Sequence, residues 1–353
     1  MEGDACCFEN WTIAGGDGLA LLDIRNLNIR FSSSANKGTR KKAECAPFHA
    51  VSDLNLQVQE GEIVCLVGES GSGKSVSAMS ILGLLAGTGR VEGEILFSGK
   101  NLLSLTEREM DEVRGRGIAM IFQDIMYSLN PVLTIGFQMV EGLRRHMRMG
   151  EGDARKRAMQ LLEKTGLPDP QQVMRKYPHQ LYGGQRQRVM IAMALTCSPK
   201  LLIADEPTTA LDVTIQLQIM ELIRSLRDET GMGVLLITHD IGVVAEMADR
   251  VYVMYAGQCV EEGSVEKVLG HPSHPYTLAL MQSVPAIHQS RDRSLFSIDG
   301  AVPERYDLLP GCRFATRCPK RASCPYTADD TLYETSGGHV RCRLSAQTGG
   351  GAA

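Results

Sequence analysis

EIVCLVGESGSGKS (62–75) is the stretch of sequence that decides the fold. Its first six residues are mostly apolar, which is typical of a buried strand. The next eight, GESGSGKS (68–75), fit the pattern G-x-x-x-x-G-K-[ST], and the apolar run VSAMSILGLL (76–85) behind them fits a helix. In this strand–loop–helix context, glycines let backbone N–H groups surround phosphate oxygens at the positive end of the helix. The stretch therefore predicts a phosphate-binding loop inside an α/β domain.

The loop supplies two reactive side chains as well as its backbone. Lys74 is expected to reach the β- and γ-phosphates of a nucleotide, and the Ser75 hydroxyl is expected to ligate Mg²⁺. A plain flexible loop of serine and glycine is the alternative, and the flanking strand and helix argue against it. The other predicted phosphate contacts come from Gly68, Ser70, Gly71, Ser72 and Gly73.

Two further apolar runs end in polar residues that suit phosphate chemistry. LLIADEP (201–207) delivers Asp205 and Glu206 at the end of a strand, where ligands bind in open α/β sheets. Asp205 fits the carboxylate that holds Mg²⁺ through water, and Glu206 is placed to polarise an attacking water. VLLITHD (234–240) presents His239, which could contact the γ-phosphate, although a lone histidine at a strand end is usually structural.

Strands and helices alternate along most of the chain. Strand patterns recur at 19–31, 118–122 and 251–255, and apolar residues at helical spacing run through 215–226. This alternation predicts a largely parallel sheet. After about residue 270 the pattern stops and prolines and cysteines replace it, which predicts a boundary near 270–300.

Composition excludes several classes of function. The 353 residues carry 37 basic and 41 acidic side chains, so the net charge of -4 gives no electrostatic reason to expect nucleic acid as a partner. No apolar run reaches the roughly 18 residues that span a bilayer, and MEGDACCFENW (1–11) lacks the pattern of a signal peptide. A soluble cytosolic protein that can dock on a membrane component is expected.

Taken in order, these motifs resemble those of the nucleotide-binding subunit of an ATP-binding cassette (ABC) transporter. The resemblance covers about residues 19–270 and includes IFQD (121–124), LYGGQ (181–185) in place of the usual LSGGQ, and TTALD (208–212). It implies a P-loop NTPase cassette of the α/β class, with a RecA-like parallel sheet core, an antiparallel β subdomain and a helical subdomain at about 125–195. A small Cys-containing C-terminal extension follows. The expected divisions are an N-terminal tail at 1–18, the ATPase domain at 19–270, the extension at 271–345 and a disordered tail at 346–353.

The resemblance implies ATP and Mg²⁺ as cofactors and assigns roles to the residues of each motif. Glu206 would be the general base, His239 the γ-phosphate contact, and Gln123 a link from Mg²⁺ and the attacking water to the surface that faces the membrane subunits. The residues that would complete the paired nucleotide sites of a dimer are Tyr182, Gly183, Gly184, Gln185 and Asp212. The family also stacks an aromatic ring on adenine. Phe31 is the candidate, and Phe48 is the alternative.

LYGGQ departs from the family pattern at Tyr182, which stands where the family usually has serine. The phenol hydroxyl lies several ångströms farther from the backbone than a serine hydroxyl and cannot simply replace it. Losing one hydrogen bond to a charged group weakens a site by about 1.5 to 3 kcal/mol. The resemblance implies that the signature serves the partner's ATP. A homodimer would then lose this contact at both sites, so the tyrosine favours a pair of unlike ATPases.

A finer resemblance, to the dipeptide/oligopeptide/nickel importer branch, comes from FQDIMYSLNP (122–131), HPSHPYTLAL (271–280) and GCRFATRCP (311–319). It implies the first of that branch's two ATPases, which pairs with a second, homologous ATPase subunit. Two transmembrane permeases and an extracytoplasmic substrate-binding protein would complete the transporter at the cytoplasmic face of the inner membrane. The implied function is ATP hydrolysis coupled to uptake of dipeptides and oligopeptides. Import of nickel chelates or glutathione, and a regulatory subunit that scarcely hydrolyses ATP, stay as alternatives. A soluble cassette acting on ribosomes or DNA is disfavoured by the single phosphate loop and the negative charge.

Four cysteines near the C-terminus form a separate candidate site. Cys312, Cys318, Cys324 and Cys342 have spacings of x5, x5 and x17, which do not match C-x2-C zinc ribbons. Four thiolates can hold a [4Fe–4S] cluster, and some ATPases of the branch carry one in this region. Zinc and unligated thiols are the alternatives. Basic neighbours such as Arg317 and Lys320 are expected to lower the thiol pKa values.

Overall fold

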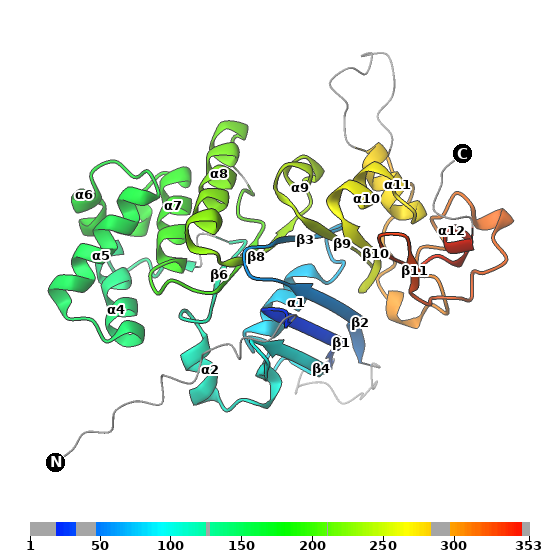
Figure 1. Ribbon diagram of the computed structural model, residues 1–353, viewed down its shortest axis with the longest axis horizontal. Helices are drawn as coiled ribbons and strands as arrows, with labels where there is room; N and C mark the ends of the chain where they lie inside the picture. The colour runs from blue at the N-terminus through cyan, green and yellow to red at the C-terminus, as the bar shows by residue number, and fades with distance from the viewer. Residues whose placement is uncertain (1–18, 33–46, 125–127, 210, 284–296, 348–353) are drawn as a thin grey trace, which may run out of the picture.

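The computed structural model describes residues 19–32, 47–124, 128–209, 211–283 and 297–347. Within these ranges the larger sheet has eight strands in the order β11-β12-β10-β9-β3-β8-β7-β6 (Figure 1). Its parallel part runs from one edge inward and consists of β6 (Ile118–Ile121), β7 (Leu201–Asp205), β8 (Gly233–Thr238), β3 (Ile63–Val67) and β9 (Arg250–Tyr255). Every residue of β3 is buried. An unbroken apolar run is the pattern of a strand that is covered on both faces, and the predicted α/β fold is confirmed.

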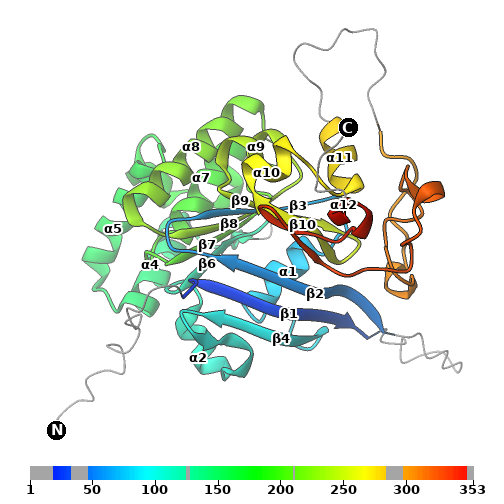
Figure 2. The same cartoon turned by 45° about the vertical axis from the view of Figure 1, so that its right-hand side comes forward.

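A smaller antiparallel sheet packs beneath the parallel one. It has the order β2-β1-β4-β5, with bounds Phe48–Val58, Leu22–Phe31, Gly89–Phe97 and Lys100–Asn101. Helix α1 (Lys74–Ile81) lies between the two sheets (Figures 1 and 2). Its buried Ala78 and Ile81 belong to the same core cluster as strand residues of both sheets. The phosphate loop therefore begins at the end of a strand of the larger sheet and leads into a helix that packs against both sheets.

The helices after β6 form a separate lobe, drawn in green at the left of Figure 1. It contains α4 (Ile135–Met147), α5 (Glu151–Lys164), α6 (Pro170–Arg175) and α7 (Gly183–Ala194). This lobe lies where the sequence predicts a helical subdomain. The remaining helices are α2 (Glu107–Val113), α8 (Val213–Thr230), α9 (Ile241–Met247), α10 (Val265–Gly270), α11 (Pro275–Gln282) and α12 (Arg343–Gln347).

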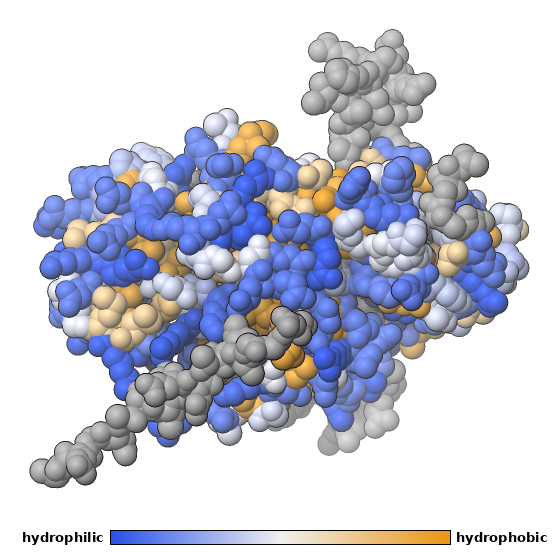
Figure 3. All heavy atoms as spheres, viewed as in Figure 1, coloured by the Kyte–Doolittle hydropathy of each residue, from blue (hydrophilic) through white to orange (hydrophobic). Residues whose placement is uncertain are grey.

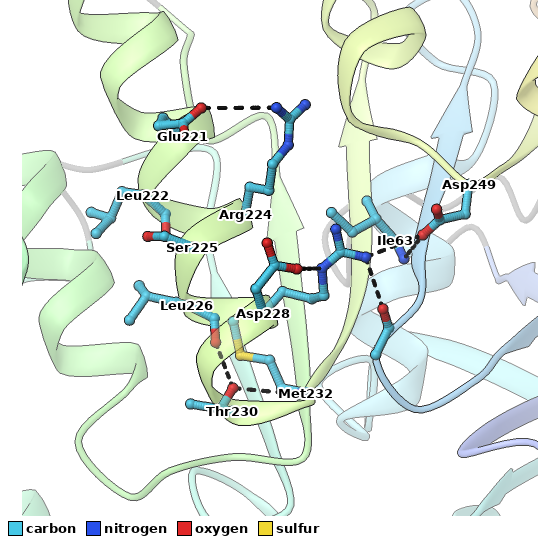
Figure 4. A network of polar contacts seen from close by, with 12 residues as sticks. Ile63, Glu221, Leu222, Arg224, Ser225, Leu226, Asp228, Thr230, Met232 and Asp249 are labelled. Atoms are coloured by element: carbon cyan, nitrogen blue, oxygen red, sulfur yellow. Dashed lines mark hydrogen bonds and ion pairs between the residues drawn. The ribbon is translucent and has the colours of Figure 1, made fainter.

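Polar contacts tie the end of α8 to the start of β3, the strand that carries the phosphate loop. The Asp249 carboxylate accepts a hydrogen bond of 2.8 Å from the N–H of Ile63 (Figure 4). Arg227 donates to the Gly61 carbonyl at 2.9 Å and lies 3.5 Å from Asp249. This network fixes the entry of β3, because it satisfies a backbone donor that the parallel ladder leaves unpaired.

The C-terminal segment joins the main sheet and the main core. β12 (Gly338–Val340) pairs with β10 (Gln258–Ser264), and β11 (Tyr333–Thr335) pairs with β12. Phe314 and Tyr306 are buried in the core cluster that also contains β3 and β7 residues. Helix α12 runs through Gln347, two residues into the predicted tail. Residues 348–353 and the predicted tail at 1–18 lie outside the described residues.

No helix in the described ranges is long and apolar enough to cross a membrane. The face of the molecule drawn in Figure 3 is mostly hydrophilic, with apolar areas that are small and scattered.

Because the C-terminal segment packs into the common core, a substitution of Phe314 is expected to lower stability strongly. This ring is 1% exposed and packs against Tyr255 and Tyr276 at centroid distances of 5.2 and 5.4 Å. Phe314→Ala is expected to lower the free energy of unfolding by about 3 to 5 kcal/mol. Urea denaturation of the full chain measures this.

The control is Leu308→Ala, in the same segment, because Leu308 is 64% exposed. Its effect should stay within about 0.5 kcal/mol. Equal stability of the two variants would contradict the packing of this segment into the common core.

Candidate functional site

Close packing sets the shape of the loop between β3 and α1. Gly68, Gly71 and Gly73 have φ angles of 149°, 78° and 102°, which side-chain-bearing residues rarely adopt. A Cβ atom on Gly68 would lie 2.1 Å from the carbonyl oxygen of Met254 in β9. The loop therefore packs closely against β9, and its backbone turns there to lead into the start of α1.

Lys74 and Ser72 place polar groups inside this loop. Lys74 is only 5% exposed, and its Nζ donates to the carbonyls of Gly68 at 2.7 Å and Glu69 at 3.0 Å. Burial lowers the pKa of Lys74, and the nearby carboxylates of Glu206 and Asp205 oppose that shift. The Ser72 hydroxyl is fully buried and has no hydrogen-bond partner within the described residues. A buried ammonium and an unpaired hydroxyl fit a loop that binds an anion with several oxygens.

Ser75 and Asp205 meet across the loop and β7. The Ser75 hydroxyl donates to Oδ1 of Asp205 at 3.1 Å. Burial raises the pKa of Asp205, and the hydrogen bond from Ser75 opposes the shift. Within the described residues no three or more His, Cys, Asp or Glu side chains converge closely enough to hold a metal ion. A hydroxyl and one carboxylate nevertheless fit Mg²⁺, which usually binds one or two carboxylates and completes its shell with water and substrate phosphates.

Glu206 is the meeting point of three separate motifs. Its carboxylate accepts hydrogen bonds from Gln123 Nε2 at 3.1 Å and Thr209 Oγ1 at 2.8 Å, and it lies 3.3 Å from His239 Nδ1. The residue has a left-handed φ of 46°, and its N–H donates to the carbonyl of Ile237 in β8 at 2.9 Å. The structure thus brings together Gln123, Glu206 and His239, which the sequence predicts as site residues.

The surroundings of Glu206 favour its ionised form. Burial raises the pKa of Glu206, but the hydrogen bonds from Thr209 and His239 and the charge of Lys74 outweigh it. The net result is a pKa below the ordinary glutamate value. At neutral pH the group is therefore a carboxylate that can accept a proton.

Thr209 is a site residue that the sequence analysis missed. It stands three positions after Glu206 in the run TTALD, which was noted only for Asp212. Its hydroxyl reaches the carboxylate because the turn after β7 folds back, with the Thr209 N–H bonded to the Glu206 carbonyl at 3.2 Å. The sequence does carry a signal for this contact, namely a hydroxyl side chain three positions after an acidic residue at the end of a strand.

The residues of LYGGQ lie apart from the loop of the same chain. Helix α7 begins at Gly183, with Tyr182 as its N-cap and no side-chain capping bond. Figures 1 and 2 place α7 in the helical lobe and α1 between the two sheets. Tyr182 is 81% exposed, and a Cβ atom on Gly183 would meet nothing within 4 Å. One residue of α7 does reach the turn that follows β7, since Gln187 Nε2 donates to the carbonyl of Pro207.

Asp212 and the two candidate aromatic residues occupy other surroundings. The Asp212 carboxylate caps α8 by accepting from the N–H of Ile215 at 3.0 Å. Phe31 and Phe48 are cross-strand partners in β1 and β2. The Phe48 ring packs edge-on against Tyr306 at 5.1 Å, so part of its surface is already covered.

The four C-terminal cysteines line one small cavity, together with His274 and Phe314. Burial raises the pKa of Cys312 to about 11 and also raises the pKa of Cys318. The expectation that basic neighbours lower these thiol pKa values is therefore wrong for both, because burial penalises the thiolate more than local charge favours it. In the part of the chain that the structure describes, these cysteines do not form a group of three or more side chains that could hold a metal ion.

Comparisons with known proteins agree with this arrangement. Residues 51–209 match the family model described as ABC transporter, and residues 260–324 match the model described as oligopeptide/dipeptide transporter, C-terminal region. The chain is 48% identical to the oligopeptide transport ATP-binding protein AppD of Bacillus subtilis, over 93% of this chain and 98% of that one. It is also 48% identical to the dipeptide transport ATP-binding protein DppD of Escherichia coli, over 85% and 89% of the two chains.

A solved structure shares the fold at the level of the cassette. It is a dimeric ATP-binding cassette in a post-hydrolysis state, bound to ADP and phosphate. It is 31% identical, covers 69% of this chain and 98% of its own, and superposes with a TM-score of 0.59.

The hydrogen bond from Thr209 predicts a measurable shift at Glu206. Because this bond stabilises the carboxylate, Thr209→Val should raise the pKa of Glu206, whereas Thr209→Ser keeps the donor and should leave it nearly unchanged. Carbon-13 NMR titration of the glutamate carboxyl groups measures both, with Glu206→Gln identifying the resonance. The same pKa in the valine and serine variants would show that the bond does not form.

Proposed function

The chain belongs to the ABC transporter family, and we propose that it is the ATPase subunit that drives import of dipeptides and oligopeptides. The observation that carries this proposal is the carboxylate of Glu206. It lies next to the phosphate loop, is ionised, and is held by Gln123, Thr209 and His239. A carboxylate held in this way can act as the base in phosphoryl transfer to water.

Residues of this chain account for each requirement of the reaction, in which ATP and water give ADP and phosphate. The loop backbone and Lys74 bind the β- and γ-phosphates. Ser75 and Asp205 would hold Mg²⁺, which supplies positive charge to the phosphate oxygens. Glu206 accepts the proton of the attacking water, and His239 orients Glu206 and contacts the γ-phosphate.

Gln123 gives the site a connection to the helical lobe. It lies two residues after the end of β6, and its amide is bonded to Glu206 at 3.1 Å. A shift of the lobe would move this amide and with it the carboxylate, which is how membrane subunits docked on the lobe would sense the state of ATP. Intact catalytic groups also argue against a regulatory subunit that binds ATP without hydrolysing it.

The substrate proposal depends on the C-terminal segment and on the relatives. The two relatives described above are named for oligopeptide and dipeptide transport, and the extension matches a family region named for the same substrates. Importers of nickel chelates or glutathione are the alternative, since selectivity lies mainly in the binding protein and permeases. The proposed partners are two permeases, an extracytoplasmic binding protein and a second ATPase, at the cytoplasmic face of the inner membrane.

Tyr182 supports pairing with an unlike ATPase. The exposed start of α7 would complete the partner's nucleotide site through the N–H groups of Gly183 and Gly184. Tyr182 lacks the short hydroxyl for that contact, so ATP on the partner's loop would meet a weaker signature. ATP on this chain's loop would instead meet the signature of the partner. Gln185 and Asp212 are proposed to line the same interface, and Phe31 to stack on adenine.

Replacement of the base tests the proposed activity. In the assembled transporter, Glu206→Gln is expected to slow ATP hydrolysis by about 10² to 10⁴ while ATP is still bound, because only proton acceptance is lost. Phosphate release and nucleotide binding are measured on the same preparation. The matched control is Glu221→Gln on the exposed side of α8, which should hydrolyse ATP as the unchanged chain does. Undiminished hydrolysis by Glu206→Gln would refute the assignment.

We further propose a [4Fe–4S] cluster on Cys312, Cys318, Cys324 and Cys342. The support is their convergence on one cavity and the chemistry of four thiols, since such clusters take Cys₄ ligation.

Metal content and absorbance decide this proposal. Anaerobically purified chain is expected to contain iron and to show a broad visible absorbance that is lost in Cys318→Ser. Cys197→Ser, which removes a buried thiol elsewhere, should retain it. Stoichiometric zinc, or no metal at all, would rule the cluster out.

A further inference from the structure

The second residue of the phosphate loop, Glu69, is held by the C-terminal segment. Arg317 binds its carboxylate with two parallel hydrogen bonds, Nη1 to Oε2 at 2.9 Å and Nη2 to Oε1 at 3.2 Å. The two residues are 248 positions apart in the chain. Such two-point pairing of arginine with a carboxylate is strong and fixes orientation as well as distance.

Every other polar group of Glu69 is also engaged. Its N–H donates to the hydroxyl of Tyr276 in α11 at 2.9 Å, and its carbonyl accepts from Lys74 Nζ at 3.0 Å. Glu69 therefore joins the C-terminal segment to the lysine that receives the phosphates. A displacement of its carboxylate would move the carbonyl that helps to hold Lys74.

Arg317 is itself rigidly placed, with a side chain only 6% exposed. Its Nε donates to the Asp299 carbonyl at 2.9 Å and its Nη2 to the Gly300 carbonyl at 3.2 Å. The guanidinium lies over the ring of Tyr255, 5.7 Å from its centroid, and that ring packs on Tyr276 at 4.7 Å. An arginine stacked on an aromatic ring and bonded to carbonyls is preorganised for a carboxylate.

The charge of Arg317 matters because of what the loop binds. A carboxylate beside a triphosphate opposes binding, and the repulsion is strongest where the site is partly buried. Pairing with the Arg317 guanidinium offsets the negative charge of Glu69. The phosphates then meet the positive charge of Lys74 and the partial positive charges of the loop N–H groups.

We propose that Arg317 is a positioning residue of the nucleotide site, which neutralises Glu69 and holds the phosphate loop in its binding shape. The segment after residue 297 is thereby part of the ATP site of its own chain, although it lies outside the cassette motifs. Arg317 directly precedes Cys318, so the residue that holds the phosphate loop is next in sequence to a cysteine that lines the cavity. This inference rests on the proposed ATPase function.

Equilibrium binding of a fluorescent ATP analogue to the purified full chain tests it. Arg317→Ala is expected to bind at least about tenfold more weakly, as for loss of a hydrogen bond to a charged group. The control is Arg305→Ala in the same segment. Arg305 pairs with Asp307 through two contacts of 2.9 Å, and its loss should leave binding unchanged.

A second substitution separates the effect of Arg317 on the charge of Glu69 from a general effect on the folding of the C-terminal segment. Glu69→Gln added to Arg317→Ala should restore binding to within about threefold of the unchanged chain, because the unpaired carboxylate is gone. If Arg317→Ala does not fold, Arg317→Met keeps the apolar stem on Tyr255 and is tested in the same pair. Thermal unfolding without nucleotide identifies such a failure.

Each outcome decides the inference. It is overturned if the Arg317 variant binds as the unchanged chain does, or if the double variant binds as weakly as the single one. Failure of the unchanged chain to bind the analogue would instead refute the proposed function.

Discussion

The close approach of Gly68 to the carbonyl oxygen of Met254 is the constraint on which the rest of the site depends. With 2.1 Å between that oxygen and the position of a Cβ atom, only glycine lets the chain turn here. The turn brings Lys74 back over the loop carbonyls and places Ser75 against Asp205. Both sheets hold α1, so the loop cannot relax without disturbing the core.

Glu206 connects this loop to the moving parts expected of a transport ATPase. Gln123 reaches it from the strand that leads into the helical lobe, and His239 reaches it from the end of β8. Gln187 of α7 bonds the carbonyl of the next residue, Pro207. This carboxylate is therefore held by a residue from the link to the helical lobe and by one from the end of β8, so its geometry can depend on both elements.

Local patterns predicted the strands, the phosphate loop and the strand-end acids, because each is a short run whose chemistry is complete in itself. Contacts between distant residues were not predictable in this way. Glu69 occupies an unspecified position of the pattern G-x-x-x-x-G-K-[ST], and only the fold brings Arg317, 248 residues away in the chain, onto its carboxylate. β11 and β12 are three residues each and too short to show alternation. For Cys312, the basic residues nearby in the sequence predicted the wrong direction of the pKa shift, since burial is a tertiary property.

The central claim is that ATP hydrolysed at this chain's loop drives peptide uptake. Its most direct test is simultaneous measurement of ATP hydrolysis and labelled dipeptide uptake in proteoliposomes that contain the ATPase pair, the permeases and the binding protein. The account predicts that uptake starts only when ATP is supplied on the ATPase side and rises in proportion to hydrolysis. Peptide accumulation without ATP, or hydrolysis that peptide and binding protein never affect, would contradict it.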